Sequence, residues 1–175
     1  MKVKTLAILI AAVAIPFGAS AAQGSGTINF KGSVIDAPCS ISADTADQTI
    51  DFGQISKTVL AQTGGTSPHV PIRIKLLGCD LANFTPALTN NTVAITFSGQ
   101  LGATAAELLT NGPTNTAIII NGYGQNVTFG TAFPGVGITA GDNTLNFDSW
   151  VKQAAGKTVA EGDFSAVASF SLSYS

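Results

Sequence analysis

Residues 164–175, the last twelve of the chain, read FSAVASFSLSYS. Side chains of a β-strand point alternately to opposite faces, so every second residue of this stretch shares a face. One set is apolar: Phe164, Ala166, Ala168, Phe170, Leu172 and Tyr174. The other set is serine apart from Val167. The alternation predicts a half-buried strand over residues 164–174, and because it runs to the last residue we expect no later segment to pair beside it.

A second alternating segment covers residues 27–35, near the start of the chain. Its apolar face carries Ile28, Phe30, Gly32 and Val34, and its polar face carries Thr27, Asn29, Lys31 and Ser33. Two amphipathic strands at opposite ends of the chain favour a function in strand pairing, either within one chain or between chains.

Residues 1–22 match a secretory signal peptide. Lys2 and Lys4 give a positive start, residues 6–17 form an apolar run, and residues 18–22 are small. The run is shorter than the roughly 20 apolar residues that span a bilayer. We therefore expect export and cleavage after Ala21 or Ala22, which leaves a soluble mature chain outside the cytoplasm.

The mature chain, residues 23–175, has the length of one domain. Of the eight Lys and Arg residues two lie in the leader, so six remain against ten Asp and Glu residues, and the formal charge is near −4. No basic patch is present, which argues against nucleic acid as a partner. Charged residues make up 10% of the chain, against about 25% in an average soluble domain. Because charge protects strand edges from pairing with other chains, its scarcity points to a subunit of an assembly.

The two cysteines, Cys39 and Cys79, are an even number in an exported chain, which indicates one structural disulfide. Closing a loop of about 40 residues restricts the unfolded chain by ~4 kcal/mol on the entropic model. The alternative is a redox-active or metal-binding thiol pair. It lacks a C-x-x-C spacing and a nearby histidine.

Short alternating or apolar runs recur between turn residues, which is typical of a β-sandwich or barrel. The strands that we expect are residues 27–35, 49–55, 70–77, 92–98, 116–121, 126–129, 144–151 and 164–174. Only residues 103–109 look helical. The aromatic side chains that we expect in the core are Phe30, Phe97, Phe147, Trp150, Phe164 and Phe170.

The patterns of common catalytic and metal sites are missing from the sequence. The one histidine, His69, has no G-x-S-x-G motif to accompany it and is expected in a solvated loop. Asp44, Asp47 and Asp51 lack the central glycine and final glutamate of a calcium loop. A pair of glycosidase carboxylates has no fixed spacing in sequence and stays open, with nothing specific in its favour. We therefore predict no enzyme, no cofactor and no metal site.

Three features together resemble the chaperone–usher pilins, the subunits of type 1-like fimbriae of Gram-negative bacteria. The first is residues 26–41, GTINFKGSVIDAPCSI, where an extension runs into a first strand and a cysteine. The second is the pattern Ile72-x-Ile74-x-Leu76-x-x-Cys79. The third is Gly162, fourteenth from the end, followed by the alternating strand and the penultimate Tyr174. The resemblance covers the whole mature chain.

The resemblance implies an all-β fold, an incomplete immunoglobulin-like β-sandwich that lacks its final strand and is completed by a donor strand from a neighbouring subunit. It implies a signal peptide at residues 1–22, an N-terminal donor-strand extension at residues 23–35 that overlaps the first strand, and a pilin domain at residues 36–175. The donor residues would be Ile28, Phe30, Gly32 and Val34, with Gly32 where the groove is shallow. The acceptor groove would be bordered by Gly162, Phe164, Ala166, Ala168, Phe170, Leu172 and Tyr174.

The function that the resemblance implies is that of a structural subunit of a surface fimbria, which polymerises by donor-strand exchange and supports adhesion. The implied partners are identical or related pilin subunits, a periplasmic chaperone that grips the carboxylate of Ser175, and an outer-membrane usher. The chain would pass through the periplasm to the cell surface. The alternatives are a minor adaptor or tip adhesin subunit and a self-contained secreted β-sandwich that serves as a binding module.

Overall fold

The computed structural model describes residues 26–175 and divides the chain into two units, Met1–Val34 and Ile35–Ser175. The expected leader, residues 1–22, and residues 23–25 of the expected extension lie outside the described residues. Within residues 26–175, no helix is long and apolar enough to cross a membrane.

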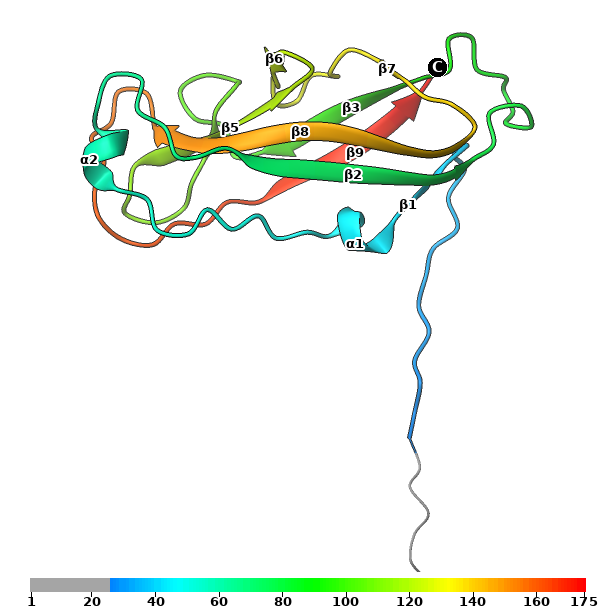
Figure 1. Cartoon of the computed structure of the whole chain (residues 1–175), viewed down its shortest axis with the longest axis horizontal. Helices are drawn as coiled ribbons and strands as arrows, with labels where there is room; N and C mark the ends of the chain where they lie inside the picture. The colour runs from blue at the N-terminus through cyan, green and yellow to red at the C-terminus, as the bar shows by residue number, and fades with distance from the viewer. Residues whose placement is uncertain (1–25) are drawn as a thin grey trace, which may run out of the picture. The chain divides into compact units, whose positions relative to one another are not determined.

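Two antiparallel β-sheets make up the second unit (Figure 1). The larger sheet has the order β1 (Ser40–Ile41), β2 (Val70–Cys79), β8 (Gly141–Gln153), β5 (Thr116–Gly122) and β4 (Leu108–Leu109), and β6 (Gln125–Asn126) pairs with β5. The smaller sheet has the order β7 (Val136–Gly137), β3 (Thr92–Gly99) and β9 (Ala168–Tyr174). β8 pairs with both β2 and β5 and is the centre of the larger sheet. β9 pairs with β3 alone and is therefore an edge strand.

The core lies between the two sheets and follows the alternation of each strand. Ile74 of β2 and Val93 and Ile95 of β3 are fully buried, while Arg73 and Lys75 beside Ile74 are exposed. Each buried aliphatic side chain contributes roughly 1.5–3 kcal/mol by leaving water. The expected strands at 70–77, 92–98, 116–121 and 144–151 are confirmed as β2, β3, β5 and β8.

The expected disulfide is confirmed between Cys39 and Cys79, 40 residues apart in sequence. Cys39 directly precedes β1 and Cys79 ends β2, and these two strands pair through Ser40 with Leu77 and Ile41 with Leu76. The bridge therefore ties the ends of two neighbouring strands.

Two of the expected strands are wrong and two are shorter than expected. Residues 27–35 and 49–55 form no strand, because no other part of residues 26–175 pairs with their backbone in a ladder. Of residues 126–129 only Asn126 belongs to a strand. The last strand begins at Ala168, although an isolated bridge joins Ser165 to Asn111 before it.

The expected helix over residues 103–109 is also wrong. Leu108 and Leu109 form β4 against β5. The carboxylate of Glu107 is buried; one oxygen lies 2.7 Å from Lys152 Nζ, and the other accepts a hydrogen bond from the Ala103 N–H at 3.2 Å. Helix propensity over so few residues is weak, and these tertiary contacts override it. The helices are instead the single turns α1 (Ala43–Ala46) and α2 (Lys57–Leu60).

The aromatic core differs in part from the one expected. Phe97 and Phe147 are buried and meet edge to face with ring centres 5.2 Å apart. Phe30 is 90% exposed, so the prediction that it lies in the core was wrong. The other core phenylalanines are Phe129 and Phe133, both in loops and both missed. Trp150, Phe164 and Phe170 are half-buried, and Trp150 stacks on the exposed His69 with ring centres 4.3 Å apart.

Candidate functional site

An open groove of about 840 Å³ runs along the first part of β9 and the residues before it. One wall is residues 164–170, and the opposite wall is residues 46–50 together with Phe52. Because β9 pairs only with β3, its other edge presents unpaired backbone N–H and C=O groups to this groove. The site is thus a gap in the sheet at the position of one further strand.

The floor of the groove is apolar and comes from both sheets. Its apolar residues include Ile72 and Ile74 of β2, Phe97 of β3, Leu108 of β4, and Ile118 and Ile120 of β5, and the buried Ser149 of β8 also lines the groove. Ile72 and Ile118 are only partly buried and pack against the main core. The groove is therefore an opening into the core, and water in it contacts side chains that a complete sandwich would bury.

The wall at residues 46–52 was missed as part of the site. These residues have an apolar alternation, in which Ile50 and Phe52 are partly buried and Asp51 is exposed. Side-chain hydrogen bonds attach the wall and the residue before it to β2: Gln48 Nε2 donates to the Arg73 carbonyl at 3.3 Å, and Thr45 Oγ1 accepts from the Lys75 N–H at 3.1 Å. The sequence signal was the alternation itself, which we interpreted as an ordinary strand.

Of the apolar residues that we expected beside the groove, Phe164, Ala166, Ala168 and Phe170 line it, whereas Leu172 and Tyr174 lie further along β9 and do not. Phe164, Ala166, Phe170, Leu172 and Tyr174 are half-buried, and all but Phe164 pack against the main core. Ala168 is exposed. The ring centres of Phe52 and Phe164 are 6.4 Å apart, so the two walls approach each other at this end of the groove.

The end of β9 is fixed to β3. Thr92 and Ser175 exchange two backbone hydrogen bonds of 3.0 Å, and their hydroxyl groups lie 2.8 Å apart. Tyr174 is partly buried, and this burial raises the pKa of its phenol above the ordinary value of 10.0. The C-terminal residue is therefore part of the sheet and not a loose tail.

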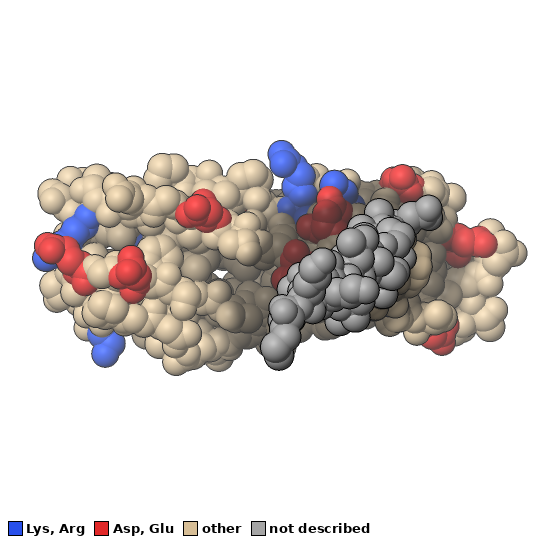
Figure 2. Space-filling view, turned by 90° about the horizontal axis from the view of Figure 1, so that it is seen from below, with Lys and Arg blue, Asp and Glu red and all other residues tan. Residues whose placement is uncertain are grey.

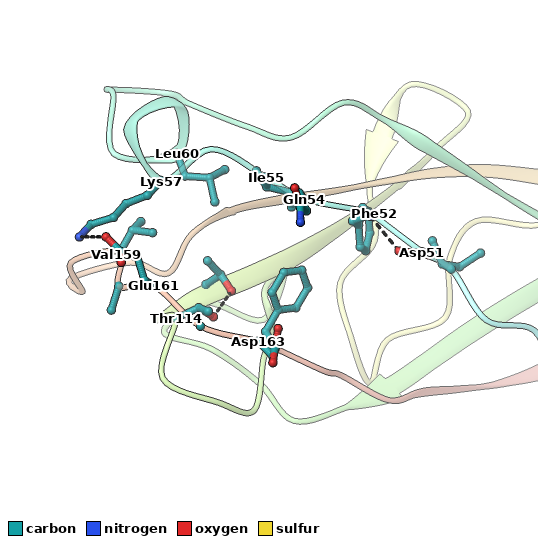
Figure 3. A pocket seen from close by; sticks show the side chains of 16 residues that line it. Asp51, Phe52, Gln54, Ile55, Lys57, Leu60, Thr114, Val159, Glu161 and Asp163 are labelled. Carbon is teal, nitrogen blue, oxygen red and sulfur yellow. Dashed lines mark hydrogen bonds and ion pairs between the residues drawn. The ribbon is translucent and has the colours of Figure 1, made fainter.

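A second pocket of about 620 Å³ adjoins the groove at Ile50, Phe52 and Phe164 (Figure 3). Leu60 and Val159 line its apolar part. Lys57 and Glu161 form an exposed ion pair of 3.3 Å on its edge. Gly162, at the start of the approach to β9, has φ +137° and lies against Pro113. Together the pocket and the groove form one continuous track, which is apolar along the groove and carries charged side chains in the pocket.

The expected donor residues belong to the other unit. Ile28, Phe30 and Val34 are 77%, 90% and 103% exposed, and Gly32 has no atom within 4 Å of the position that a Cβ would take. Monomeric soluble proteins rarely expose such a run of large apolar side chains, which marks an interaction surface.

Residues 26–175 contain no group of three or more His, Cys, Asp or Glu side chains placed to hold a metal ion. Charged residues are few and scattered on the face that Figure 2 shows. What the site can do chemically is pair backbone groups and bury apolar side chains.

The model of the fimbrial protein family matches residues 28–175. The chain belongs to this family. The KS71A fimbrillin of Escherichia coli is 44% identical over 94% of this chain and 95% of its own length. The PRS fimbrial major pilin protein of Escherichia coli is 48% identical over 90% of this chain and 99% of its own length.

Two solved structures to which this chain is similar also come from pili. The crystal structure of the P pilus rod subunit PapA has a TM-score of 0.74 and 40% identity, and covers 79% of this chain and 100% of its own. A subunit in the structure of a chaperone–usher pilus, solved to explain rod uncoiling, has a TM-score of 0.82 and 43% identity, and covers 87% of this chain and 97% of its own.

The fold is therefore the immunoglobulin-like sandwich that lacks its last strand, as expected. This fimbrial protein is a structural subunit of a surface pilus, and its partners are pilin subunits.

Proposed function

We propose that this fimbrial protein polymerises by donor-strand exchange, in which residues 23–35 of one copy fill the groove beside β9 of the next. The observation that supports the proposal is that one chain carries both halves of such a joint. The groove lacks a strand, and the extension carries Ile28, Phe30 and Val34 with their side chains in water.

The energetics of the joint favour assembly. Burial of the three large side chains contributes on the order of 5–9 kcal/mol, at ~1.5–3 kcal/mol each. The added strand also pairs with the free backbone groups of β9, as in other cases of strand addition. Gly32 would lie in the shallow part of the groove, where a larger side chain would clash.

Because its groove is open, the subunit needs other proteins to protect it before assembly at the cell surface. An exposed apolar groove beside an unpaired strand edge promotes aggregation. We therefore expect a periplasmic chaperone to lend a strand to the groove and to hold the carboxylate of Ser175. An outer-membrane usher then exchanges that strand for the extension of the next subunit. The role is structural and requires no catalysis and no cofactor.

Unboiled denaturing electrophoresis of the protein co-expressed with its chaperone and usher tests the proposal. Wild type should give a ladder of detergent-resistant multimers, and a variant that lacks residues 23–34 should give none. A matched control replaces Asn29 with Ser on the polar face and should keep the ladder. A single monomer band in every case, from protein that unfolds reversibly without chaperone, would show a complete sandwich and refute the proposal.

A further inference from the structure

The groove and the extension each carry a single charged residue. Of the residues that line the groove only Asp47 is charged, and of residues 23–35 only Lys31 is charged. We propose that Lys31 of one copy binds the carboxylates of Asp47 and Asp51 on the rim of the next copy's groove. This attraction selects the chain's own extension over a neutral or acidic one. The inference rests on the proposed function, in which a second copy supplies the occupant of the groove.

Matching lengths place Lys31 at the middle of the groove. The apolar face of the extension covers residues 28–34, and the wall along β9 that lines the groove covers residues 164–170. Both are seven residues long, roughly 20 Å in a strand. Lys31 is the central residue of its segment. It therefore lies near the middle of the groove whether the added strand runs parallel or antiparallel to β9.

The opposite wall brings two carboxylates to the same place. Asp47, Thr49 and Asp51 alternate along the wall and are exposed, while Ile50 and Phe52 are partly buried. Lys31 belongs to the polar face of the extension, which points out of the groove when Phe30 points in. The ammonium group and the two carboxylates therefore share the outer side of the joint, with Thr49 near the centre and an aspartate two residues to each side.

The cations that border this wall are Arg73 and Lys75 of β2, whose backbone groups bond to Gln48 and Thr45, and Lys75 is already paired with Asp44 at 2.7 Å. Among residues 26–175, Asp47 and Asp51 take part in no ion pair. One oxygen of Asp51 accepts a hydrogen bond from the Gly53 N–H at 2.8 Å. On the β9 side the outward residues are Ser165, Val167 and Ser169.

In the adjoining pocket the one cation is that of Lys57, which is paired with Glu161, and Asp163 adds a further negative charge. The whole track thus presents a net negative field to Lys31.

The attraction is available in more than one register of the added strand. A shift of the added strand by two residues keeps its apolar side chains in the groove. The same shift moves Lys31 by about 7 Å along the wall, from beside Thr49 to beside Asp47 or Asp51. Because a lysine side chain is long and flexible, its ammonium group reaches a carboxylate in each of these registers.

The test measures how fast synthetic peptides of residues 23–35 displace the chaperone from the purified chaperone–subunit complex. Replacing Lys31 with Gln should slow the exchange about 2–5-fold, as expected for one exposed ion pair, and Lys31→Glu should slow it further. Lys31→Arg and the control Asn29→Gln should exchange at the wild-type rate. The differences should shrink in 1 M salt, where the screening length is about 3 Å.

A charge reversal on the subunit separates this inference from the proposed function. A complex with Asp47→Lys and Asp51→Lys should prefer the Lys31→Glu peptide over wild type; Asp47→Asn with Asp51→Asn serves if the reversed subunit fails to fold. Equal rates for all peptides on the wild-type complex would overturn the inference and leave donor-strand exchange intact. Failure of every peptide, wild type included, to displace the chaperone would overturn both.

Discussion

Gly162 controls the path of the chain into the groove wall. Its φ of +137° lies in a region that residues with a side chain rarely adopt, and a Cβ there would lie 2.5 Å from Pro113 Cγ. The bridge between Asn111 and Ser165 follows three residues later, with hydrogen bonds of 2.7 and 3.1 Å. Gly162 is thus needed for both backbone and steric reasons.

We expect Gly162→Ala to lower the free energy of unfolding by ~3 kcal/mol, because backbone strain and the contact with Pro113 add. Urea unfolding of the purified subunit measures the loss. The control is Gly53→Ala, where φ is +61° but nothing lies within 4 Å, so only a backbone cost of about 1–2 kcal/mol applies. Equal losses in the two variants would show that the contact with Pro113 is unimportant.

Two other residues show where sequence reasoning fails at this scale. The burial of Glu107 depends on Lys152, 45 residues away, and no local pattern reports such a pair. Phe30 lies on the apolar face of an alternating segment, as a core residue does. The sequence does not show whether that face packs into the core of its own chain or of another.

At the scale of elements, the strands that could be predicted are those with a partner in the same chain. β2, β3, β5 and β8 have regular alternation and long ladders. Residues 27–35 and 49–55 have the same alternation and no ladder, because a periodic pattern reports which face is apolar and says nothing about the neighbouring backbone. The groove was predicted at β9, and its opposite wall was not, since the two walls are more than 100 residues apart in sequence.

Tyr174, at the end of β9, makes the folding stability of the subunit depend on pH in the alkaline range. Partial burial raises the pKa of Tyr174, so the folded state favours the neutral phenol more than the unfolded state does. The stability that this contributes is fully present below the ordinary pKa of 10.0 and is lost as the pH rises through the raised value.

We therefore expect the free energy of unfolding to fall more steeply above pH 10 in wild type than in Tyr174→Phe. Urea unfolding at a series of pH values checks the slope. The control is Tyr123→Phe, which leaves Tyr174 in place. Identical slopes in wild type and Tyr174→Phe would contradict the prediction.

At the scale of the whole molecule, an open core must be held together without its last strand. The Cys39–Cys79 bridge joins the start of the sandwich to the end of β2 and so closes one side of the larger sheet. The paired cysteines could be predicted from their even number and the expected leader, whereas their place at the ends of β1 and β2 required the fold.

Replacing both Cys39 and Cys79 with Ser should lower the free energy of unfolding by ~4 kcal/mol on the entropic model. The shift of the urea midpoint in the purified subunit measures it, and wild type kept in reductant should match the double variant. A loss below about 1 kcal/mol would mean that the unfolded chain is already restricted without the bridge.

The position of the same bridge also determines how a fibre would carry mechanical load. In a fibre joined through residues 23–35, tension enters each subunit at the root of the extension, four residues before Cys39. From Cys39 the force passes through a covalent bond to the end of β2 and from there into the ladder with β8. Residues 42–69, which include the weakly held wall at residues 46–52, lie inside the loop that the bridge closes and before β2, so they are kept off the load path and do not unravel when the fibre is pulled.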